Sequence, residues 1–512
     1  MTETAAPERD TAAPVPAGDT TRDQLDAIAA AARRAFAVTV ASTAAERAAW
    51  IRAAADALDA ARDELVPIAD EETRLGAVRL TGEVARTTAQ LRLFADAILE
   101  GSYLEATIDH PDPTTIPPRP DLRRMLRPLG PVAVFGASNF PFAFSVAGGD
   151  TASALAAGCP VIVKGHPAHP RLSARTAEIV AGALVAAGAP EGVFAHVTGH
   201  ETGVALVQHP EVRAVGFTGS LGGGRALFDL AQQRPDPIPF YGELSAVNPV
   251  LITPAALEAR ADELAAGLAG SFTLGAGQFC TNPGVVLVPA GSDFGERVAA
   301  ALDASSTGPA PMLTEGIAGA FASGIAGLAA RDGVDVVAGD PTAQQPGTGE
   351  PVVLRTTTAA VIADPGTLLH ECFGPSTLLI EYADLADALA AVRAVGGSLT
   401  ATVHAQPSDE LAPIVEVLSE VAGRVLFAGW PTGVAVSWAQ QHGGPWPSTT
   451  STHTSVGVSA MRRFLRPIAF QDAPDAALPP ELRDGNPLGI PRRIDGMLVL
   501  PAGVPGRRPA GG

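Results

Sequence analysis

Apolar positions divide the chain into a helical first region and two later regions in which short apolar runs alternate with helical spacing. Between residues 21 and 101, apolar residues recur every three or four positions along Ala-rich segments, which predicts amphipathic helices. The predicted helices cover residues 23–38, 43–62, 65–75 and 81–100. Thr43 and Glu46 fit a capping box at the start of the second helix. We expect these helices to form a scaffold.

From residue 130 onward, the pattern changes to buried strands that alternate with helices. The predicted strands cover residues 132–135, 161–163, 194–197 and 214–217. The predicted helices between and after them cover residues 149–157, 171–187, 203–209 and 223–233. Such alternation with short connections predicts a doubly wound parallel sheet, in which ligands bind beyond the carboxyl ends of the strands.

A second alternating region starts near residue 249 and predicts another α/β domain. Its predicted strands cover residues 249–253, 285–288, 333–338, 359–363, 377–380, 399–403 and 424–427. Its predicted helices cover residues 254–269, 292–303, 314–330 and 383–395. We find no internal repeat that would indicate a solenoid.

Several segments are predicted to be extended or disordered. Residues 1–20 are rich in Pro, Ala and acidic residues without a period, which is typical of disorder. Residues 105–130 contain too many prolines for a helix, and residues 464–472 also lack helical spacing. Residues 473–512 are rich in Pro and Gly and have little to bury.

Composition limits the class of protein. The chain has 512 residues, of which 46% are hydrophobic, and a net charge of −19. The charge argues against nucleic acid or an anionic membrane as a partner, because both would be repelled. The sequence has no 18-residue apolar run and no secretory signal pattern, so we expect a cytoplasmic protein. Its three cysteines do not make a disulfide framework.

One cysteine lies in a stretch that suits chemistry. Cys280 stands in the segment LGAGQFCTNPG, where small residues allow another molecule to approach the backbone. Cys159 precedes a predicted buried strand and reads as a small hydrophobe, and Cys372 adjoins Glu371. A single cysteine is often an unreactive structural residue. It acts as a nucleophile only where a base and an oxyanion site are also present.

Polar side chains at predicted strand ends supply candidates for those two roles. Asn139 follows the strand at 132–135, and its amide can donate to an oxyanion or make local turn bonds. Glu243 ends a strand segment and is either a base or a surface acid. Glu371 is either a ribose-binding carboxylate or a turn acid. The glycine-rich turn after residue 217 suits a phosphate at a helix N-terminus, although such turns are often purely structural.

Six motifs, in this order, resemble those of the aldehyde dehydrogenase superfamily. They read ASNFPFA, GCPVIVKGHP, FTGS, ELSAVNP, GQFC and ECFGP, and the resemblance spans roughly residues 20 to 470. The pattern departs at Ser245 and Ala246, where the family more often has two glycines, and at His370, where it more often has an acid. Lys164, the only lysine of the chain, lies in the second motif.

The resemblance implies a catalytic cycle and a cofactor site. Cys280 would attack an aldehyde, Asn139 would hold the oxyanion, and Glu243 would activate the water that hydrolyses the thioester, rather than coenzyme A accepting it. Helix dipoles, Glu243 or the cofactor would help to form the thiolate. The implied cofactor residues, for the adenosine ribose, the pyrophosphate and the nicotinamide ribose, are Lys164, Gly219, Ser220, Gly224, Glu371 and Phe373.

The resemblance also bears on the choice of nucleotide. Many NAD-preferring members have a glutamate three residues after the lysine, and Pro167 stands there in this chain. With no carboxylate to repel a 2′-phosphate, we predict that NADP is accepted alongside or in preference to NAD. His166 and His169 are candidates to contact that phosphate, or are simply loop histidines. No metal site is predicted.

The C-terminal stretches QQHGGPWPSTT, TSVGVSAMRRFLRPIAFQ and LRDGNPLGIPRRIDG look like the 2,5-dioxopentanoate (α-ketoglutaric semialdehyde) dehydrogenase branch. That branch also contains fatty aldehyde dehydrogenases, so a medium- or long-chain aldehyde is the alternative substrate. A catalytically silent binding protein of the same fold is a minor alternative. The candidate residues for the substrate pocket are aromatic: Phe142, Phe279, Trp438 and Trp446.

The resemblance implies two doubly wound α/β domains and an extended oligomerisation arm. We expect a disordered tail at 1–20, a Rossmann-like cofactor domain at 21–245 and a catalytic domain at 246–445. Residues 446–512 would return to the cofactor domain and complete the arm that residues 105–130 begin. The expected assembly is a homodimer or homotetramer.

Overall fold

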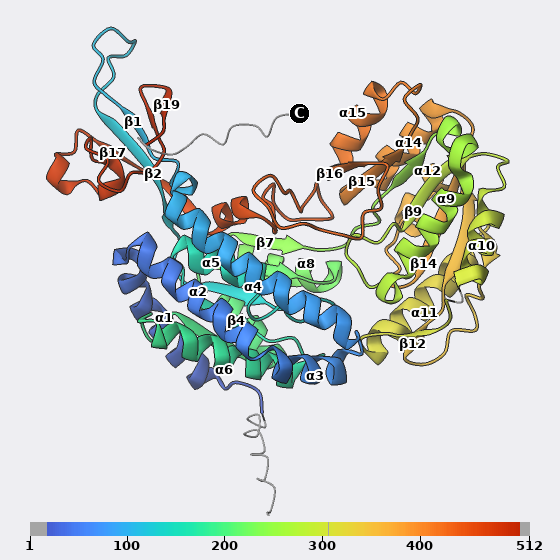
Figure 1. Ribbon diagram of the computed structural model, residues 1–512, viewed down its shortest axis with the longest axis horizontal. Coiled ribbons are helices and arrows are strands. Elements are labelled where there is room, and N and C mark those ends of the chain that lie inside the picture. Colours follow the sequence, from blue (N-terminus) through green and yellow to red (C-terminus); the bar gives the residue numbers. More distant parts are fainter. Residues whose placement is uncertain (1–17, 306, 502–512) are drawn as a thin grey trace, which may run out of the picture.

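The computed structural model describes residues 18–305 and 307–501, which form two α/β bodies and a projecting arm (Figure 1). The fold class predicted from the sequence is therefore confirmed. Residues 1–17 of the expected disordered tail lie outside the described residues. The expected disorder does not extend to Thr20, because its N–H donates to the carbonyl oxygen of Thr198 at 3.0 Å.

The four predicted N-terminal helices are present. Their bounds are α1 Arg22–Ala41, α2 Ala44–Ala60, α3 Arg62–Thr73 and α4 Ala77–Glu100. The capping box at α2 is confirmed: the Thr43 side chain accepts from the backbone of Glu46, and the Glu46 carboxylate accepts from the Thr43 N–H at 2.7 Å. These contacts satisfy N–H groups that the first helical turn leaves free.

The first sheet is five-stranded, entirely parallel and doubly wound. Its strands are β3 Val132–Phe135, β4 Val161–Lys164, β5 Phe194–Val197, β6 Ala214–Thr218 and β7 Phe240–Glu243, in the order β5-β4-β3-β6-β7. The helices that connect them are α5 Gly149–Ala157, α6 Pro170–Ala186, α7 His200–Gln208 and α8 Leu221–Gln232. The strand order reverses between β3 and β6, so the loops after these two strands border the crevice where such sheets bind ligands.

Both faces of this sheet are covered, as the continuous apolar strands predict. Along β3, Val132 and Val134 belong to one core with residues of α2, α4, α5 and α6. The alternate residues Ala133 and Phe135 belong to a second core with residues of α1, α7 and α8. The sheet therefore holds α4, which borders the active site described below, on one fixed face.

The second sheet has seven strands, in the order β11-β13-β14-β9-β8-β15-β16. All its pairs are parallel except the edge pair β11–β13. The strands are β8 Val250–Ile252, β9 Val285–Pro289, β11 Asp335–Ala338, β13 Val352–Thr357, β14 Ser376–Tyr382, β15 Ser398–His404 and β16 Ala422–Phe427. The helices around it are α9 Pro254–Thr273, α10 Phe294–Ser305, α11 Glu315–Ala329, α12 Thr358–Ala363, α13 Pro365–Leu368, α14 Leu385–Val395 and α15 Ala412–Val421. A separate short pair joins β10 Ala310–Pro311 and β12 Thr348–Gly349.

One predicted strand in this region is wrong. Residues 359–363 form α12 instead, and the strand is β13, directly before it. The side chain of Thr357 accepts a hydrogen bond from the Ala360 N–H and so begins a helix at this point. A short apolar run fits a buried strand and a short helix equally well, and this cap decides between them. The helix α15 was not predicted.

The arm is a five-stranded sheet built from both ends of the chain. Its strands are β1 Thr107–Asp109, β2 Leu122–Pro128, β17 Leu465–Gln471, β18 Arg492–Ile494 and β19 Met497–Val499, in the order β17-β2-β1-β18-β19. The predicted extended segments are thus confirmed, but the expectation that residues 473–512 bury little is wrong for the described part. Residues from both segments form a small core: Ala106, Met125, Leu478, Leu482 and Ile490.

The C-terminal segment also returns to the first sheet and is held there by a buried ion pair. Arg463, which is 2% exposed at its side chain, donates to Asp150 of α5 at 2.7 Å. Thr450 Oγ1 donates to the carbonyl oxygen of Phe240 at 2.6 Å, beside β7. These contacts fix residues 446–464 beside the strand that ends at Glu243.

The buried pair predicts a stability effect. Replacing Arg463 with Met leaves the Asp150 carboxylate buried without its cation, so we expect the free energy of unfolding to fall by about 3 kcal/mol. Urea-induced unfolding measures the change. The matched control is Arg393→Met, whose partner Glu420 lies 3.0 Å away and whose side chain is 52% exposed. This control should lose less than about 1 kcal/mol, and equal losses would contradict the prediction.

Candidate active site

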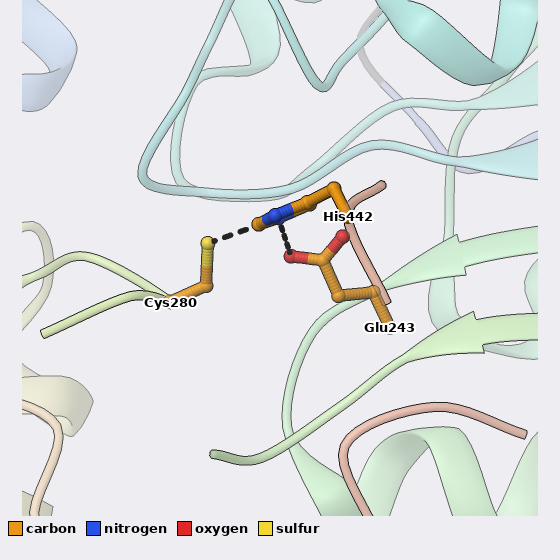
Figure 2. A group of neighbouring side chains, drawn as sticks. All are labelled: Glu243, Cys280 and His442. Carbon is orange, nitrogen blue, oxygen red and sulfur yellow. Dashed lines mark hydrogen bonds and ion pairs between the residues drawn. The ribbon is translucent and has the colours of Figure 1, made fainter. Parts of the chain in front are cut away.

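A thiol, an imidazole and a carboxylate meet between the two sheets (Figure 2). The Sγ atom of Cys280 lies 3.6 Å from Nε2 of His442, and the same nitrogen lies 3.0 Å from Oε1 of Glu243. The hydroxyl of Ser455 donates to the other oxygen of Glu243 at 2.7 Å. The imidazole is therefore placed to exchange a proton with either neighbour.

The Cys280 loop is shaped by its small residues and by an asparagine. Gly277 has a positive φ, and a Cβ there would lie 2.2 Å from the carbonyl oxygen of Gly374, so this position requires glycine. The Asn248 side chain, which is fully buried, donates to the carbonyl oxygens of Cys280 and Asn282, each at 2.9 Å. The thiol is thus presented on a braced loop.

Glu243 and His442 come from segments about 200 residues apart. Glu243 is the last residue of β7 and forms an isolated bridge with Thr449 in the C-terminal segment. His442 lies in the loop before that bridge, and its N–H donates to Thr454 Oγ1 at 2.8 Å. Glu243 is 2% exposed and His442 is fully buried, so their contact is shielded from bulk water.

The pKa values of Glu243 and Cys280 shift in opposite directions. Burial acts to raise the pKa of Glu243, but the charge and hydrogen bond of His442, together with hydrogen bonds from Ser455 and Cys280, outweigh it and lower the pKa to about 2. Burial, followed by the negative charge of Glu243, raises the pKa of the Cys280 thiol well above its ordinary range. The charge of Glu243 therefore disfavours the thiolate. The neutral form of the His442 imidazole can take the thiol proton at Nε2, and the cation so formed is the form that pairs with Glu243.

Asn139 lies beside the thiol on the loop after β3. Its Nδ2 atom donates to the carbonyl oxygen of Gln278 at 3.0 Å, two residues before Cys280. The backbone carbonyl oxygen of Asn139 accepts a hydrogen bond from the Arg79 guanidinium at 2.6 Å. Asn139 and Cys280 line the same cleft, so the second amide proton of Asn139 can serve an oxyanion formed above Cys280.

This cleft has a volume of about 560 Å³ and runs along the carboxyl ends of β3, β4 and β6. Several predicted cofactor and catalytic residues line it together: Asn139, Pro167, Gly219, Ser220, Cys280, Glu371 and Phe373. Ser220 caps α8, and Gly222 and Gly223 after it are exposed, so the start of this helix is open to a ligand. These residues fit a dinucleotide whose reactive end reaches Cys280.

Glu371, at the opposite wall of the cleft, has an altered acidity. Burial raises its pKa to about 7, although hydrogen bonds from the Ser245 side chain and the Ala246 backbone act in the opposite direction. Ser245 and Ala246 are the positions where the sequence departs from the glycines expected there. Because serine replaces the expected glycine at position 245, its hydroxyl group donates a hydrogen bond to the Glu371 carboxylate.

Two other predicted cofactor residues lie outside this lining. Lys164 ends β4 with a partly buried side chain, close to Gly203 of α7. Gly224 is inside α8, where a Cβ would lie 2.1 Å from the Leu244 side chain, so it serves close packing. Of the two candidate histidines, His166 lines the cleft, and burial lowers its pKa to about 3. His169 is fully buried and its ring bonds Ala137 and Ser173, so it is not available to a phosphate.

The candidate substrate residues are dispersed. Phe142 is 2% exposed and packs in the core beneath α4. Phe279 is also buried, and its ring meets Phe140 edge-on at 5.5 Å between centroids. Trp438 and Trp446 are about half exposed, at 49% and 48%, and neither lines the cleft that contains Cys280. Their role in a substrate pocket stays a prediction.

His442 and Ser455 were not foreseen as functional residues. Both lie in the C-terminal stretches that resemble the semialdehyde dehydrogenase branch, QQHGGPWPSTT and TSVGVSAMRR. Neither residue follows a predicted strand, so the local pattern offers no reason to place it at the site. Cys280, His442 and Glu243 also offer metal-ligand atoms within 4.8 Å of one another. Their mutual hydrogen bonds already account for this closeness, and the absence of a metal stays a prediction.

Comparison with known proteins decides the family. The model of the aldehyde dehydrogenase family matches residues 3–466. The chain belongs to this family. It is 47% identical over 406 residues to alpha-ketoglutaric semialdehyde dehydrogenase 2 of Azospirillum brasilense, covering 78% of this chain and 77% of that protein. It is 43% identical over 404 residues to alpha-ketoglutaric semialdehyde dehydrogenase of Acinetobacter baylyi, with the same coverage.

Solved structures agree on the fold. Aldehyde dehydrogenase C of Pseudomonas syringae superposes with a TM-score of 0.74 at 22% identity, covering 90% of this chain and 91% of that one. The protein is thus an enzyme of the aldehyde dehydrogenase family, and it uses a nicotinamide cofactor. No helix among the described residues is long and apolar enough to cross a membrane.

The negative charge of Glu243 beside Cys280 predicts how the reactivity of the thiol depends on pH. Replacing Glu243 with Gln removes a negative charge beside Cys280, so the thiol pKa should fall. We expect the midpoint of the pH profile for alkylation by iodoacetamide to move down by about one pH unit, which equals about 1.4 kcal/mol. The variant Cys280→Ala corrects for labelling of Cys159 and Cys372. An unchanged or higher midpoint would show that Glu243 does not suppress the thiolate.

Proposed function

We propose that this enzyme oxidises 2,5-dioxopentanoate to 2-oxoglutarate with NADP or NAD. The observation that carries the reaction is the contact of Cys280 with His442 and of His442 with Glu243, beside the amide of Asn139. Support for this substrate comes from the two semialdehyde dehydrogenases, at 47% and 43% identity.

The first half of the reaction forms a bond to sulfur. His442 Nε2 accepts the proton of Cys280, and the thiolate attacks the aldehyde carbon. The resulting oxyanion is stabilised by the Asn139 side chain, and such a donor typically lowers the barrier by about 3 kcal/mol. A nicotinamide held in the cleft would supply the acceptor for the hydride that leaves this adduct. Cys280 then carries the acyl group as a thioester.

The second half releases the acid. After His442 has released the thiol proton to solvent, a water molecule attacks the thioester and gives its proton to the His442 imidazole, whose cation pairs with the ionised Glu243 carboxylate. Ser455 holds that carboxylate in place through its hydroxyl group. The expelled thiolate takes the proton back from His442, which regenerates the Cys280 thiol, and the carboxylic acid loses its own proton to solvent and leaves as its anion. No step requires coenzyme A.

We infer that NADP is accepted because Pro167 lines the cleft at the position where a carboxylate would exclude the 2′-phosphate. His166, although it lines the same cleft, is neutral near pH 7 because burial lowers its pKa to about 3. Tolerance of the phosphate therefore depends on the missing acid rather than on a histidine cation.

We infer further that the arm joins copies of this chain into a homodimer or homotetramer. The last strand of the arm, β19, is an edge strand with exposed apolar side chains: Met497, Leu498 and Val499 are 71%, 63% and 42% exposed. An exposed apolar edge of this kind is suited to pairing with another chain.

The role of Pro167 predicts the cofactor preference. Wild-type enzyme should show kcat/KM for NADP at least comparable with that for NAD. Pro167→Glu should lower kcat/KM for NADP by roughly tenfold or more, through repulsion of the 2′-phosphate, while NAD is affected less. Steady-state kinetics with both cofactors measure this, with Pro167→Gln as the uncharged control. A wild-type preference for NAD of a hundredfold or more would contradict the inference.

The substrate is tested by a panel of aldehydes. We expect 2,5-dioxopentanoate to give a higher kcat/KM than C6 to C12 aliphatic aldehydes, because these long chains carry no anion. Cys280→Ala should abolish turnover of every aldehyde while cofactor binding, followed by fluorescence, is retained. Higher values for the aliphatic aldehydes would favour the alternative, a medium- or long-chain aldehyde dehydrogenase. Turnover by Cys280→Ala would overturn the mechanism.

A further inference from the structure

Two arginines of α4 point the same way toward the catalytic loops. Arg79 and Arg86 are seven residues, or about two helical turns, apart and so lie on one face of the helix. The guanidinium carbon of Arg79 lies 4.8 Å from the ring centroid of Phe279 and 5.1 Å from that of Phe140. That of Arg86 lies 5.7 Å from Phe140 and 5.1 Å from Phe144. The aromatic rings therefore bind both cations in one cluster.

This cluster adjoins the reacting groups. Phe279 directly precedes Cys280, and the ring of Phe144 lies 6.2 Å from the ring of His442. The charge of Arg86 also acts on Cys280, because it offsets part of the rise in the pKa of the thiol. Neither arginine lines the cofactor cleft. The two cations therefore approach Cys280 from a direction other than the dinucleotide.

Neither cation has a close ion-pair partner among the described residues. The Nη1 atoms of Arg79 and Arg86 are buried without a hydrogen-bond partner among residues 18–305 and 307–501. Across the same described residues, no carboxylate oxygen forms an ion pair within 4.0 Å of either guanidinium. A buried charge of this kind is costly unless something pairs with it.

Glu83 lies between the two arginines along α4 but is committed elsewhere. Its Oε1 atom accepts from the N–H groups of Phe142 and Ala143, at 2.8 and 2.9 Å. Burial raises the pKa of Glu83, despite those hydrogen bonds and the nearby arginines. Glu83 therefore fixes the loop that carries Asn139 and forms no ion pair within 4.0 Å with Arg79 or Arg86.

We propose that Arg79 and Arg86 bind the carboxylate of the substrate while its aldehyde carbon reaches Cys280. Planar guanidinium groups pair well with carboxylates, and the unpaired Nη1 donors supply the hydrogen bonds. This inference rests on the proposed function and refines it, because it assigns the specificity to short aldehydes that end in an anionic group. A long alkyl chain in the same place would bury these donors unpaired.

The variant Arg86→Gln tests the proposal most cleanly. The kcat/KM for 2,5-dioxopentanoate should fall roughly 10- to 100-fold, the range expected for loss of a charge-assisted hydrogen bond. For pentanal, an uncharged aldehyde of the same length, kcat/KM should fall much less, because only the effect of the Arg86 charge on the Cys280 thiol is lost. Arg86→Lys should recover part of the lost activity toward the anion, because it keeps the charge. Arg79 is the less clean choice, since its guanidinium also donates to Asn139 at 2.6 Å.

A matched control comes from the same helix. Arg92 is exposed and pairs with Asp56 and Asp59, at 2.6 and 2.7 Å, on the side of α4 that faces α2. Arg92→Gln should leave both kcat/KM values unchanged, and thermal unfolding should show that all variants are folded. If Arg86→Gln loses activity equally toward pentanal and 2,5-dioxopentanoate, the arginine supports the fold of the site and the proposal is wrong.

A second pair of aldehydes separates this inference from the proposed function. If wild-type enzyme does not oxidise 2,5-dioxopentanoate, the proposed substrate is wrong, and succinic semialdehyde is then compared with butanal. The inference holds if wild-type enzyme prefers the anionic member of this pair and Arg86→Gln removes the preference. It is overturned if wild-type enzyme shows no preference for the anion in either pair.

Discussion

The active site depends on the position of one imidazole, that of His442, which contacts both other reacting groups. His442 Nε2 lies within reach of both the Glu243 carboxylate, which ends a strand of the first sheet, and the Cys280 thiol, on a loop that leads into the second sheet. The histidine itself comes from the C-terminal segment, which Arg463 and Thr450 fasten to the first sheet. The doubly wound domains, the returning segment and the braced cysteine loop are all needed for these three atoms to meet.

Charge is distributed around this contact in a consistent way. Burial and Glu243 keep the thiol protonated until His442 removes its proton, while Glu243 itself stays ionised. On the α4 side, Arg79 and Arg86 place positive charge that no carboxylate of the described chain takes up. The site therefore combines a neutral nucleophile with a cationic wall, an arrangement that suits an aldehyde joined to an anionic group.

The sequence predicted those parts of the molecule in which local pattern decides structure. The apolar runs at β3, β4, β5 and β6 were long enough to place the first sheet, and Asn139 and Glu243 followed from its strand ends. Where long-range contacts decide, prediction failed. Residues 359–363 became helical because of the cap at Thr357, and residues 473–501 found a core only through contact with the distant residue Met125. His442 carried no local signal, because its partner Glu243 is about 200 residues away.

The division of the catalytic groups between separate parts of the chain has a consequence for heat tolerance. Glu243 ends the last strand of the first sheet, whereas Cys280 stands on the loop that leads into β9 of the second sheet. A slight loosening between the two bodies would separate the thiol from its base while each body stayed folded. Catalysis would then fade at temperatures at which spectroscopic signals of folding are still intact.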